Sequence, residues 1–245
     1  MQLTGEIIRQ KRRFEMFDKS TKKTVLEVNS FFGKYNMHFD DKIKKKFTYY
    51  DTPNNDLQKS RIALFKTQIG NFTELNMATE KISATHRYTT RDIYKHVKKI
   101  IKPHDSIFKH KDFLINSFQD MFMSSLNFDP EFLLRKLQEV IVIETVSEEY
   151  RSVNPMGLKI TYSFDADTYT NFLTNKKASA NILTIYEHSP KHTDADFEDL
   201  YGKLIRYCKE LTPTNENKIT IARRMTAISA SDYLDNKNKK KKKSK

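Results

Sequence analysis

The first third of the chain contains short segments in which apolar and polar residues alternate, a pattern typical of β-strands with one buried face. These segments cover residues 25–32, 47–51, 60–69, 72–79 and 81–88. Gly70 and Asn71 separate two of them and predict a two-residue hairpin turn. Ahead of the segments, apolar residues at positions 7, 8, 14 and 17 lie among charges and predict a helix over residues 6–19.

The middle of the chain changes to helical spacing. A first helix is predicted over residues 90–101, where Pro103 ends it, and a second over residues 105–126. A third helix begins after Asp129, a favoured N-cap residue, with Pro130 in its first turn. These segments predict a helical insert at about residues 90–140.

Strand patterns return in the last third, and a helix lies among them. The predicted strands are residues 140–145, 156–164, 178–187 and 218–223, and an amphipathic helix runs from Asp194 or Asp196 to about residue 211. Strands, helical insert, strands, helix and strand do not form a βαβ alternation. The order predicts an α+β fold, mainly an antiparallel β-barrel with a helical insertion and a C-terminal helix, in one domain over residues 1–236.

Charge is distributed unevenly along the 245 residues. The formal net charge is +13, but seven lysines lie in residues 237–245, so residues 1–236 carry 13 − 7 = +6. Like charges without apolar neighbours predict that residues 237–245 form a disordered polybasic tail. Such a tail serves nuclear import, a grip on nucleic acid, or solubility alone.

Basic clusters within the body of the chain add to the tail. Each cluster alone is compatible with a solvated surface, but together they favour a polyanionic partner such as RNA or DNA. The candidate nucleic-acid-binding residues are Lys42, Lys44, Lys45, Lys46, Lys98, Lys99, Lys239, Lys240, Lys241, Lys242 and Lys243.

The sequence lacks the patterns that would predict several other classes of site. Cys208 is the one cysteine, which predicts a reducing intracellular compartment, nucleus or cytoplasm, and leaves no Cys-based zinc site. No apolar run is long enough to predict a membrane partner. His188 and His192 are separated by Pro190, which breaks any helix that would place both on one face. We therefore predict no metal site from histidine or cysteine.

Residues 26–33, LEVNSFFG, resemble the first-strand motif of the triphosphate tunnel family, in which an acid, a second acid and a base alternate before a glycine. The family includes RNA triphosphatases of mRNA capping and the CYTH phosphatases. Residues 47–70, FTYYDTPNNDLQKSRIALFKTQIG, resemble its next strand pair, and LKITYSF and ILTIYE follow in the family's order. The resemblance leaves out the helical insert and the tail. It implies a closed barrel whose acids hold Mg²⁺ or Mn²⁺ and whose bases grip a triphosphate.

At the positions where the family has catalytic and phosphate-binding residues, this sequence has few charged residues. Glu27 matches the first acid and is the candidate catalytic residue, but Asn29 replaces the second acid and Phe31 replaces the base. The other vacated positions, where the family has two bases, a lysine and a closing acid pair, are Phe65, Thr67, Ala78, Thr184 and Tyr186. Glu187 is acidic but is expected on the opposite face of its strand.

Three functions follow as alternatives. The first is a non-catalytic tunnel subunit without a cofactor, which binds nucleic acid or a protein partner in mRNA capping or transcription. The second is an active polynucleotide 5′-triphosphatase or polyphosphatase, which requires Mg²⁺ or Mn²⁺ and about four carboxylates around it. The third is a basic nucleic-acid-binding protein of unrelated fold.

Overall fold

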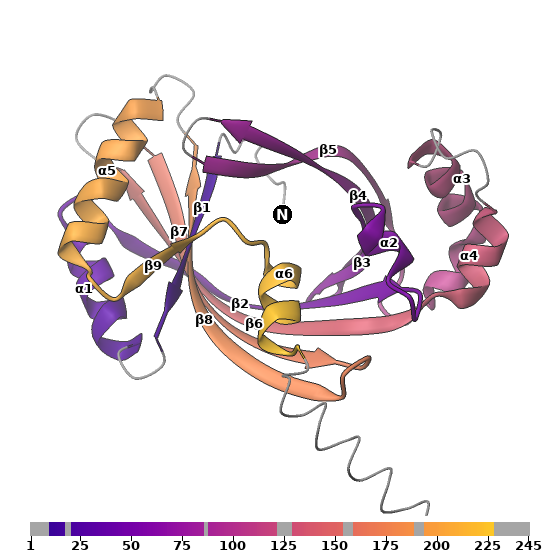
Figure 1. The fold of residues 1–245 in the computed structure, drawn as a ribbon. Coiled ribbons are helices and arrows are strands. Elements are labelled where there is room, and N and C mark those ends of the chain that lie inside the picture. Colours follow the sequence, from indigo (N-terminus) through magenta and orange to yellow (C-terminus); the bar gives the residue numbers. More distant parts are fainter. Residues whose placement is uncertain are drawn as a thin grey trace, which may run out of the picture.

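The computed structural model describes residues 10–17, 21–85, 88–121, 129–153, 159–188 and 194–227. These residues form a curled antiparallel sheet of nine strands in the order β5-β4-β3-β2-β6-β7-β8-β1-β9 (Figure 1). The strands are β1 (Gln10–Met16), β2 (His38–Asp51), β3 (Ile62–Ile69), β4 (Phe72–Thr85), β5 (Tyr88–Ile100), β6 (Gln138–Val153), β7 (Lys159–Asn171), β8 (Lys176–Glu187) and β9 (Leu211–Thr214). Within the described residues the edge strands β5 and β9 do not pair, so the sheet curls without closing.

Helices cover both ends of the outer face and one part of the inner face. They are α1 (Thr21–Gly33), α2 (Asp56–Lys59), the 3₁₀-helix η2 (Ile107–His110), α3 (Lys111–Met121), α4 (Pro130–Lys136), α5 (Asp194–Tyr207) and α6 (Lys218–Met225). Figure 1 shows α1 and α5 outside one end of the sheet, α3 and α4 outside the other, and α6 within the concave side. The predicted α+β fold is confirmed.

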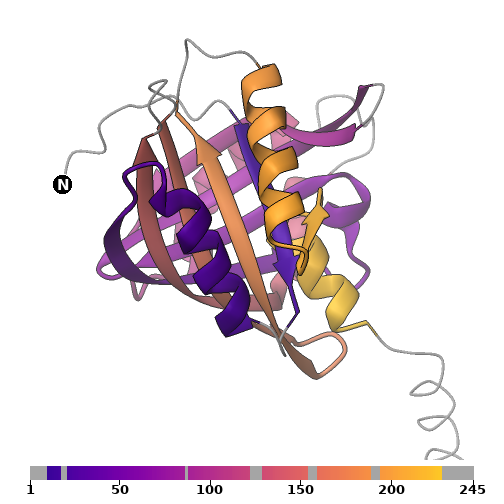
Figure 2. The ribbon, with the colours of Figure 1, turned by 90° about the vertical axis from the view of Figure 1, so that its left-hand side faces the viewer.

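The largest core lies between the outer face and the helices α1 and α5. Figure 2 shows these two helices lying across the strands β7, β8 and β1. Phe14 of β1 is buried there, and Phe32 of α1 stacks on Tyr162 of β7 with ring centroids 4.5 Å apart. Burial of aromatic side chains of this size supplies much of the stability of such a layer.

A second core lies on the outer face at the other end of the sheet. Leu64 and Leu75 of β3 and β4 pack there against Leu114 and Phe118 of α3 and against Leu134 of α4. The concave face carries a third core, in which Ile219 and Ala222 of α6 are clustered with residues of β6, β7 and β8. Because apolar packing holds α6 to the sheet, its charged residues have fixed positions beside the strands.

Local signals account for the elements that were predicted correctly. The hairpin of β3 and β4 turns at Gly70, whose φ of 56° lies in the left-handed region that glycine adopts readily. Asp129 caps α4 by accepting hydrogen bonds from the backbone N–H groups of Glu131 (2.9 Å) and Phe132 (3.2 Å). The predicted helix from residue 194 is α5, and β6 and β8 contain the strands predicted over residues 140–145 and 178–187. The strand predicted over residues 156–164 overlaps β7 from Lys159 onwards, and its first three residues lie outside the described residues.

The strand predicted over residues 25–32 is wrong, because that segment is part of the helix α1. Its buried residues are Thr24, Val28, Phe31 and Phe32, which are three or four positions apart and so share one face of a helix. The same apolar residues also fit a strand when read in alternation. Packing against β7 and β8 decides between the two periods, and sequence pattern alone does not.

Three further predictions are also wrong. The segment read as a helix over residues 6–19 contains β1, in which Phe14 and Met16 are buried on alternate positions. The segment read as a helix over residues 90–101 belongs to β5, which pairs with β4. The segment read as a strand over residues 218–223 belongs to α6, where Asn217 caps the first turn by accepting from the backbone N–H of Thr220 at 2.9 Å. The helical insert therefore begins after β5, and its helices lie at η2, α3 and α4.

Candidate polyanion site on the concave face

Two aspartates of β7 are buried on the concave face. Asp165 and Asp167 are two positions apart, so both side chains point to the same side of the strand. Lys218, the first residue of α6, places its ammonium group 3.1 Å from Oδ2 of Asp165 and 2.7 Å from Oδ1 of Asp167. The side chains of Asp165 and Asp167 are 4% and 0% exposed, and that of Lys218 is 13% exposed. One partly buried ammonium group therefore joins two buried carboxylates.

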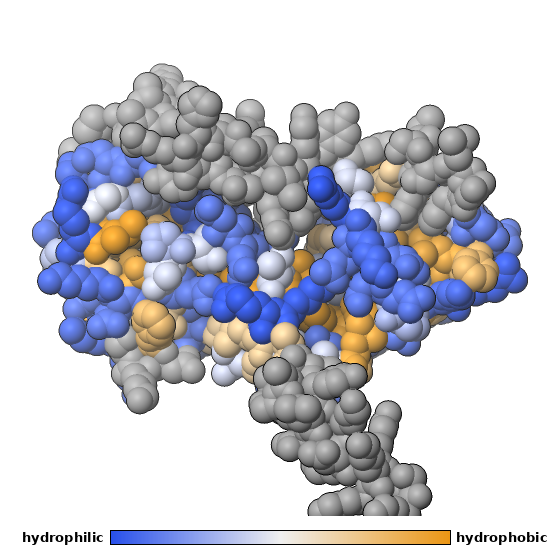
Figure 3. All heavy atoms as spheres, in the orientation of Figure 1, coloured by the Kyte–Doolittle hydropathy of each residue, from blue (hydrophilic) through white to orange (hydrophobic). Residues whose placement is uncertain are grey.

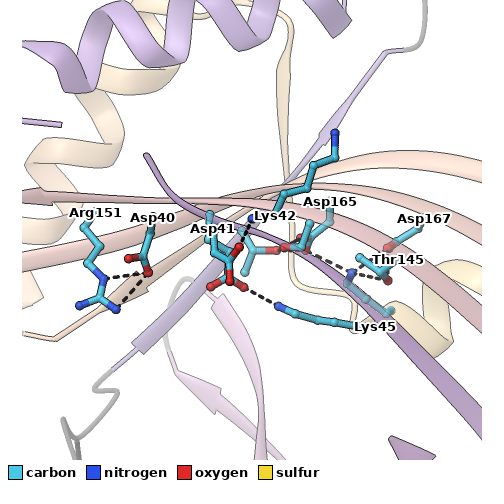
Figure 4. Close-up of polar contacts among 12 residues, drawn as sticks. Asp40, Asp41, Lys42, Lys45, Thr145, Arg151, Asp165 and Asp167 are labelled. Carbon is cyan, nitrogen blue, oxygen red and sulfur yellow. Dashed lines mark hydrogen bonds and ion pairs between the residues drawn. The ribbon is translucent and has the colours of Figure 1, made fainter. Parts of the chain in front are cut away.

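Side-chain hydroxyl groups complete the surroundings of the two aspartates. Figure 4 shows Asp165 and Asp167 beside Thr145 and Lys45, and the pair formed by Asp40 and Arg151 further along the sheet. The hydroxyl donors are Ser147 (2.6 Å) and Thr184 (3.1 Å) to Asp165, and Thr145 (2.6 Å) and Tyr169 (3.1 Å) to Asp167. The carboxylate oxygens are thus engaged by donors of the protein itself.

Burial and the lysine charge act in opposite directions on these carboxyl groups. Burial alone would raise the pKa of Asp165, but the charges of Lys218 and Lys45 and the hydrogen bond from Ser147 hold it below its ordinary value. For Asp167 burial prevails over Lys218 and raises the pKa. Lys218 thus favours the charged form of both aspartates.

Basic residues of β1 and β2 lie on the same face. Lys45 is paired with Glu149 of β6, with 2.5 Å between ammonium and carboxylate. Arg13 donates from Nη1 to the backbone oxygen of Glu216 at 3.3 Å, and its buried Nε has no hydrogen-bond partner among the described residues. The ammonium group of Lys11 lies 4.8 Å from the centre of the Tyr186 ring. Among the described residues, neither Lys11 nor Arg13 forms an ion pair with a carboxylate.

Lys11 is electrostatically strained by these surroundings. Its pKa is lowered well below the ordinary value, first by the loss of hydration inside the sheet and next by repulsion from Arg13. The side chain still has exposed surface, so solvent and solutes reach it. An anion bound between Lys11 and Arg13 would relieve this repulsion.

The acids of the concave face do not fit a divalent cation. The described residues contain no group of three or more histidine, cysteine, aspartate or glutamate side chains that could hold a metal ion. Mg²⁺ and Mn²⁺ need open carboxylate oxygens, whereas Lys218 contacts both Asp165 and Asp167. We therefore derive no step through a metal ion.

Glu27, the predicted catalytic residue, does not join this cluster. It lies on α1, on the outer side of the sheet, and its carboxylate is 3.6 Å from the ammonium group of Lys23 one helical turn away. Asn29 also lies on α1 and accepts a hydrogen bond from Tyr162 at 3.0 Å. The motif reading at residues 26–33 therefore placed both residues on a strand that does not exist.

The predicted nucleic-acid-binding lysines are divided between the two faces. Four of the predicted lysines lie on β2, and among them only Lys45 shares the face of the aspartates. Lys42 and Lys46 lie on the outer face, where they are ion-paired with Glu148 and Glu144 of β6, respectively. Lys44 is exposed on that outer face as well. On β5 neighbouring residues point to opposite sides, and Lys98 lies 3.3 Å from Glu74 while Lys99 is exposed. Lys239, Lys240, Lys241, Lys242 and Lys243 lie outside the described residues.

The remaining positions implied by the resemblance do lie on the concave face. Phe65 stacks on Tyr49 with ring centroids 5.2 Å apart, and Thr67 receives a hydrogen bond from Asn76 at 3.4 Å. Ala78 pairs with Ala63 in the same row, and Thr184 and Tyr186 face the aspartates. Glu187 lies on the opposite face, as expected, where its buried carboxylate accepts a hydrogen bond from Tyr201 of α5.

Three residues of the site were not singled out by the sequence reasoning: Asp165, Asp167 and Lys218. Lys11 and Arg13 belong to one of the basic clusters in the body of the chain, residues 9–13. A signal existed for the two aspartates, because the segment SFDADTY alternates acids as a strand facing a tunnel would. No local signal could have joined Lys218 to them.

Comparison with known proteins identifies the fold. No protein-family model matches the sequence, and no curated protein matches it. A candidate adenylate cyclase from Bacillus halodurans matches the structure with a TM-score of 0.54 at 9% identity, over 87% of this chain and 96% of its own. A candidate adenylyl cyclase from Hippeastrum, described as having a dominant triphosphatase activity, matches with a TM-score of 0.50 at 9% identity, over 87% and 94%. These proteins have the triphosphate tunnel, or CYTH-like, fold, and this chain shares it; the alternative of an unrelated fold is wrong.

Within the described residues, none of the helices is both long and apolar enough to cross a membrane.

Proposed function

We propose that this chain is a non-catalytic protein of the triphosphate tunnel fold, which binds the phosphates of a nucleic acid on its concave face and acts in mRNA capping or transcription. The observation that carries the proposal is the ion pairing of Lys218 with both Asp165 and Asp167. A lysine ammonium group takes the place in which metal-assisted hydrolysis would need a divalent cation.

Lys218 also makes the binding of a metal ion to the two aspartates costly. A divalent cation could reach the two carboxylates only if Lys218 left a position where its side chain is 13% exposed. This movement would break both ion pairs and leave the lysine charge to compete with the metal ion beside the same carboxylates. The proposed protein therefore holds phosphates without hydrolysing them.

Lys11 and Arg13 are the proposed phosphate-binding residues. Both belong to β1, both reach the concave face, and the buried Nε of Arg13 has no partner among the described residues. A guanidinium group binds phosphate oxygens through two parallel hydrogen bonds, and the nearby ammonium group adds a second charge. Charge-assisted hydrogen bonds of this kind contribute about 1.5–3 kcal/mol each.

Binding of a short 5′-triphosphate RNA, followed by fluorescence anisotropy, tests the proposal. We expect Arg13→Gln and Lys11→Gln each to weaken binding about tenfold or more, as the loss of about 1.5–3 kcal/mol requires. Lys22→Gln is the matched control, since it removes an exposed charge from α1 on the outer side. Equal weakening by all three variants would contradict a specific concave site.

One observation favours a second candidate, an active metal-dependent polynucleotide 5′-triphosphatase or polyphosphatase. Asp165 and Asp167 share the concave face of β7 and have the bases Lys218 and Lys45 nearby, and this combination of charges is the one that phosphoryl hydrolysis uses. Release of phosphate in the presence of Mg²⁺ or Mn²⁺, lost in Asp165→Asn, would establish this function in place of the first. If turnover were instead lost in Glu27→Gln, Glu27 on α1 would be the catalytic residue.

A further inference from the structure

A cavity lies away from the aspartates, where α6 meets α2 and the ends of β2 and β3. Its volume is about 500 Å³. Neither the aspartates nor Lys11, Arg13 and Lys218 line it. Figure 3 shows hydrophobic residues beside hydrophilic ones around the position that α6 and α2 have in Figure 1. The cavity is therefore distinct from the proposed phosphate site.

The walls of the cavity differ in chemistry. The apolar lining residues include Ile62, Ile219 and Tyr49. The charged ones are Arg61, Arg223 and Arg224, with Asp51 as the one carboxylate among the lining residues. Arg223 is paired with Asp51, and Arg224 with Glu15 and Glu216, so a wholly apolar ligand would leave Arg61 without a partner among the described residues. A metal cation would be repelled by the guanidinium groups. The walls together fit an anion with an apolar, planar body.

Asp51 is already used by the protein. It is 1% exposed and accepts backbone hydrogen bonds from Thr52 (2.8 Å), Leu57 (2.9 Å) and Gln58 (3.1 Å), which fix the start of α2. Its carboxylate is also 3.6 Å from Arg223. Asp51 thus holds the α2 turn in place and offsets Arg223, while Arg224 is paired with Glu15 (2.5 Å) and Glu216 (2.8 Å). Arg61 is therefore the lining residue whose positive charge no carboxylate of the described residues offsets.

Arg61 is the residue best placed to meet a ligand. Its φ of 58° lies in the left-handed region, which costs a residue with a Cβ about 1 kcal/mol. The turn is held by a hydrogen bond from its backbone N–H to Gln58 at 2.9 Å. Its side chain is exposed, and among the described residues its guanidinium group has no hydrogen-bond or ion-pair partner. The chain therefore keeps a strained backbone at a residue whose charged group has no polar partner among the described residues.

We propose that this cavity binds a phosphate monoester that carries a planar ring, either a free mononucleotide or the terminal nucleotide of an RNA strand. Arg61 and Arg223 receive the phosphate, because the planar fork of a guanidinium group matches its oxygens. The apolar wall with Tyr49 receives the ring, which stacks on aromatic and aliphatic surface. The cavity volume of about 500 Å³ lies within the range of small-molecule sites.

Calorimetric titration of the full chain with uridine 5′-monophosphate tests the proposal. We expect saturable binding that Arg61→Gln weakens about tenfold, the effect of losing one charge-assisted contact. Arg61→Gln should fold normally, since its guanidinium group has no partner among the described residues. Lys59→Gln is the matched control, because Lys59 is exposed on the adjacent α2 and does not line the cavity; its affinity should stay within twofold.

Further titrations separate the ligand chemistry and the two sites. Uridine and inorganic phosphate should each bind at least tenfold more weakly than the nucleotide. A short RNA that carries a 5′- or 3′-phosphate distinguishes a strand end from a free nucleotide, and either source supports the proposal. The tenfold effect of Arg61→Gln on nucleotide affinity should persist in a Lys11→Gln background, so this test does not depend on the concave site. No binding of nucleotide or RNA end at millimolar concentration, or equal binding by Arg61→Gln and wild type, would overturn the proposal.

Discussion

Replacement of Lys218 by methionine tests the structural basis of the site. Lys218→Met keeps an unbranched side chain of similar length and removes the charge that joins Asp165 to Asp167. The two carboxylates are 4% and 0% exposed, so neither can regain its hydration without opening the core. Removing one partner from a buried ion pair costs about 3–5 kcal/mol. The free energy of unfolding of natural domains is about 5–15 kcal/mol, so this loss would be a large part of the total stability.

Urea unfolding followed by circular dichroism measures this loss at neutral pH. Hydrogen bonds from Ser147 and Thr145 remain in the variant, so we expect a decrease of about 3 kcal/mol, the lower end of the range. Adding Asp167→Asn to Lys218→Met removes one of the unpaired charges and should restore at least half of the stability. A decrease below about 1 kcal/mol, or no rescue by the second substitution, would refute the assigned pairing.

The pH dependence of the same variant gives an independent check. Lys218 lowers the pKa of both aspartates, so both pKa values should rise when it is removed. A carboxyl group whose folded pKa lies above its unfolded value binds protons preferentially in the folded state, so stability rises as the pH falls towards that pKa. The loss in free energy of unfolding caused by Lys218→Met should therefore become smaller as the pH falls. In wild type the depressed pKa of Asp165 contributes stability above about pH 4, which is lost as the pH falls through its folded pKa.

Three more outcomes follow from the placement of charged residues. Glu27→Gln should leave RNA affinity within twofold and the free energy of unfolding within about 0.5 kcal/mol, because Glu27 pairs with Lys23 on an outer helix; a tenfold loss of affinity by anisotropy would contradict this. A bound phosphate should raise the depressed pKa of Lys11, so RNA affinity should fall as the pH rises, and this dependence should be reduced in Lys11→Gln; an identical pH profile in both proteins would count against Lys11 as a contact. Deleting residues 237–245, which contain seven lysines, should reduce the slope of log affinity against log salt by up to about 5, and an unchanged slope would show that the tail does not touch the nucleic acid.

The parts of the fold that the sequence predicted have strong local signals. The turn at Gly70 and the N-cap at Asp129 each set the conformation of a few neighbouring residues, whatever the rest of the chain does. The first strand had no such signal. The inward residues of β1 are Lys11, Arg13 and Glu15, and charges on the concave face of a strand resemble the solvent face of a helix.

The site itself depends on contacts between distant parts of the chain. Lys218 is 51 positions from Asp167 along the sequence, and only the packing of α6 into the curled sheet brings them together. Because α6 was read as a strand, the sequence offered no reason to pair the two. The resemblance at residues 26–33 misplaced the acids, yet its implied order of β3, β4 and β8 put Phe65, Thr67 and Thr184 on the correct face.

Incubation of the full chain with 5′-triphosphate RNA and Mn²⁺ tests the central claim most directly, if complex formation and free phosphate are followed in the same sample. A non-catalytic tunnel protein with Lys218 between its aspartates should form a saturable complex in which the RNA keeps all its phosphates. Lys11→Gln and Arg13→Gln should weaken that complex. Phosphate release that requires the metal, increases with protein concentration and disappears in Asp165→Asn would contradict the claim.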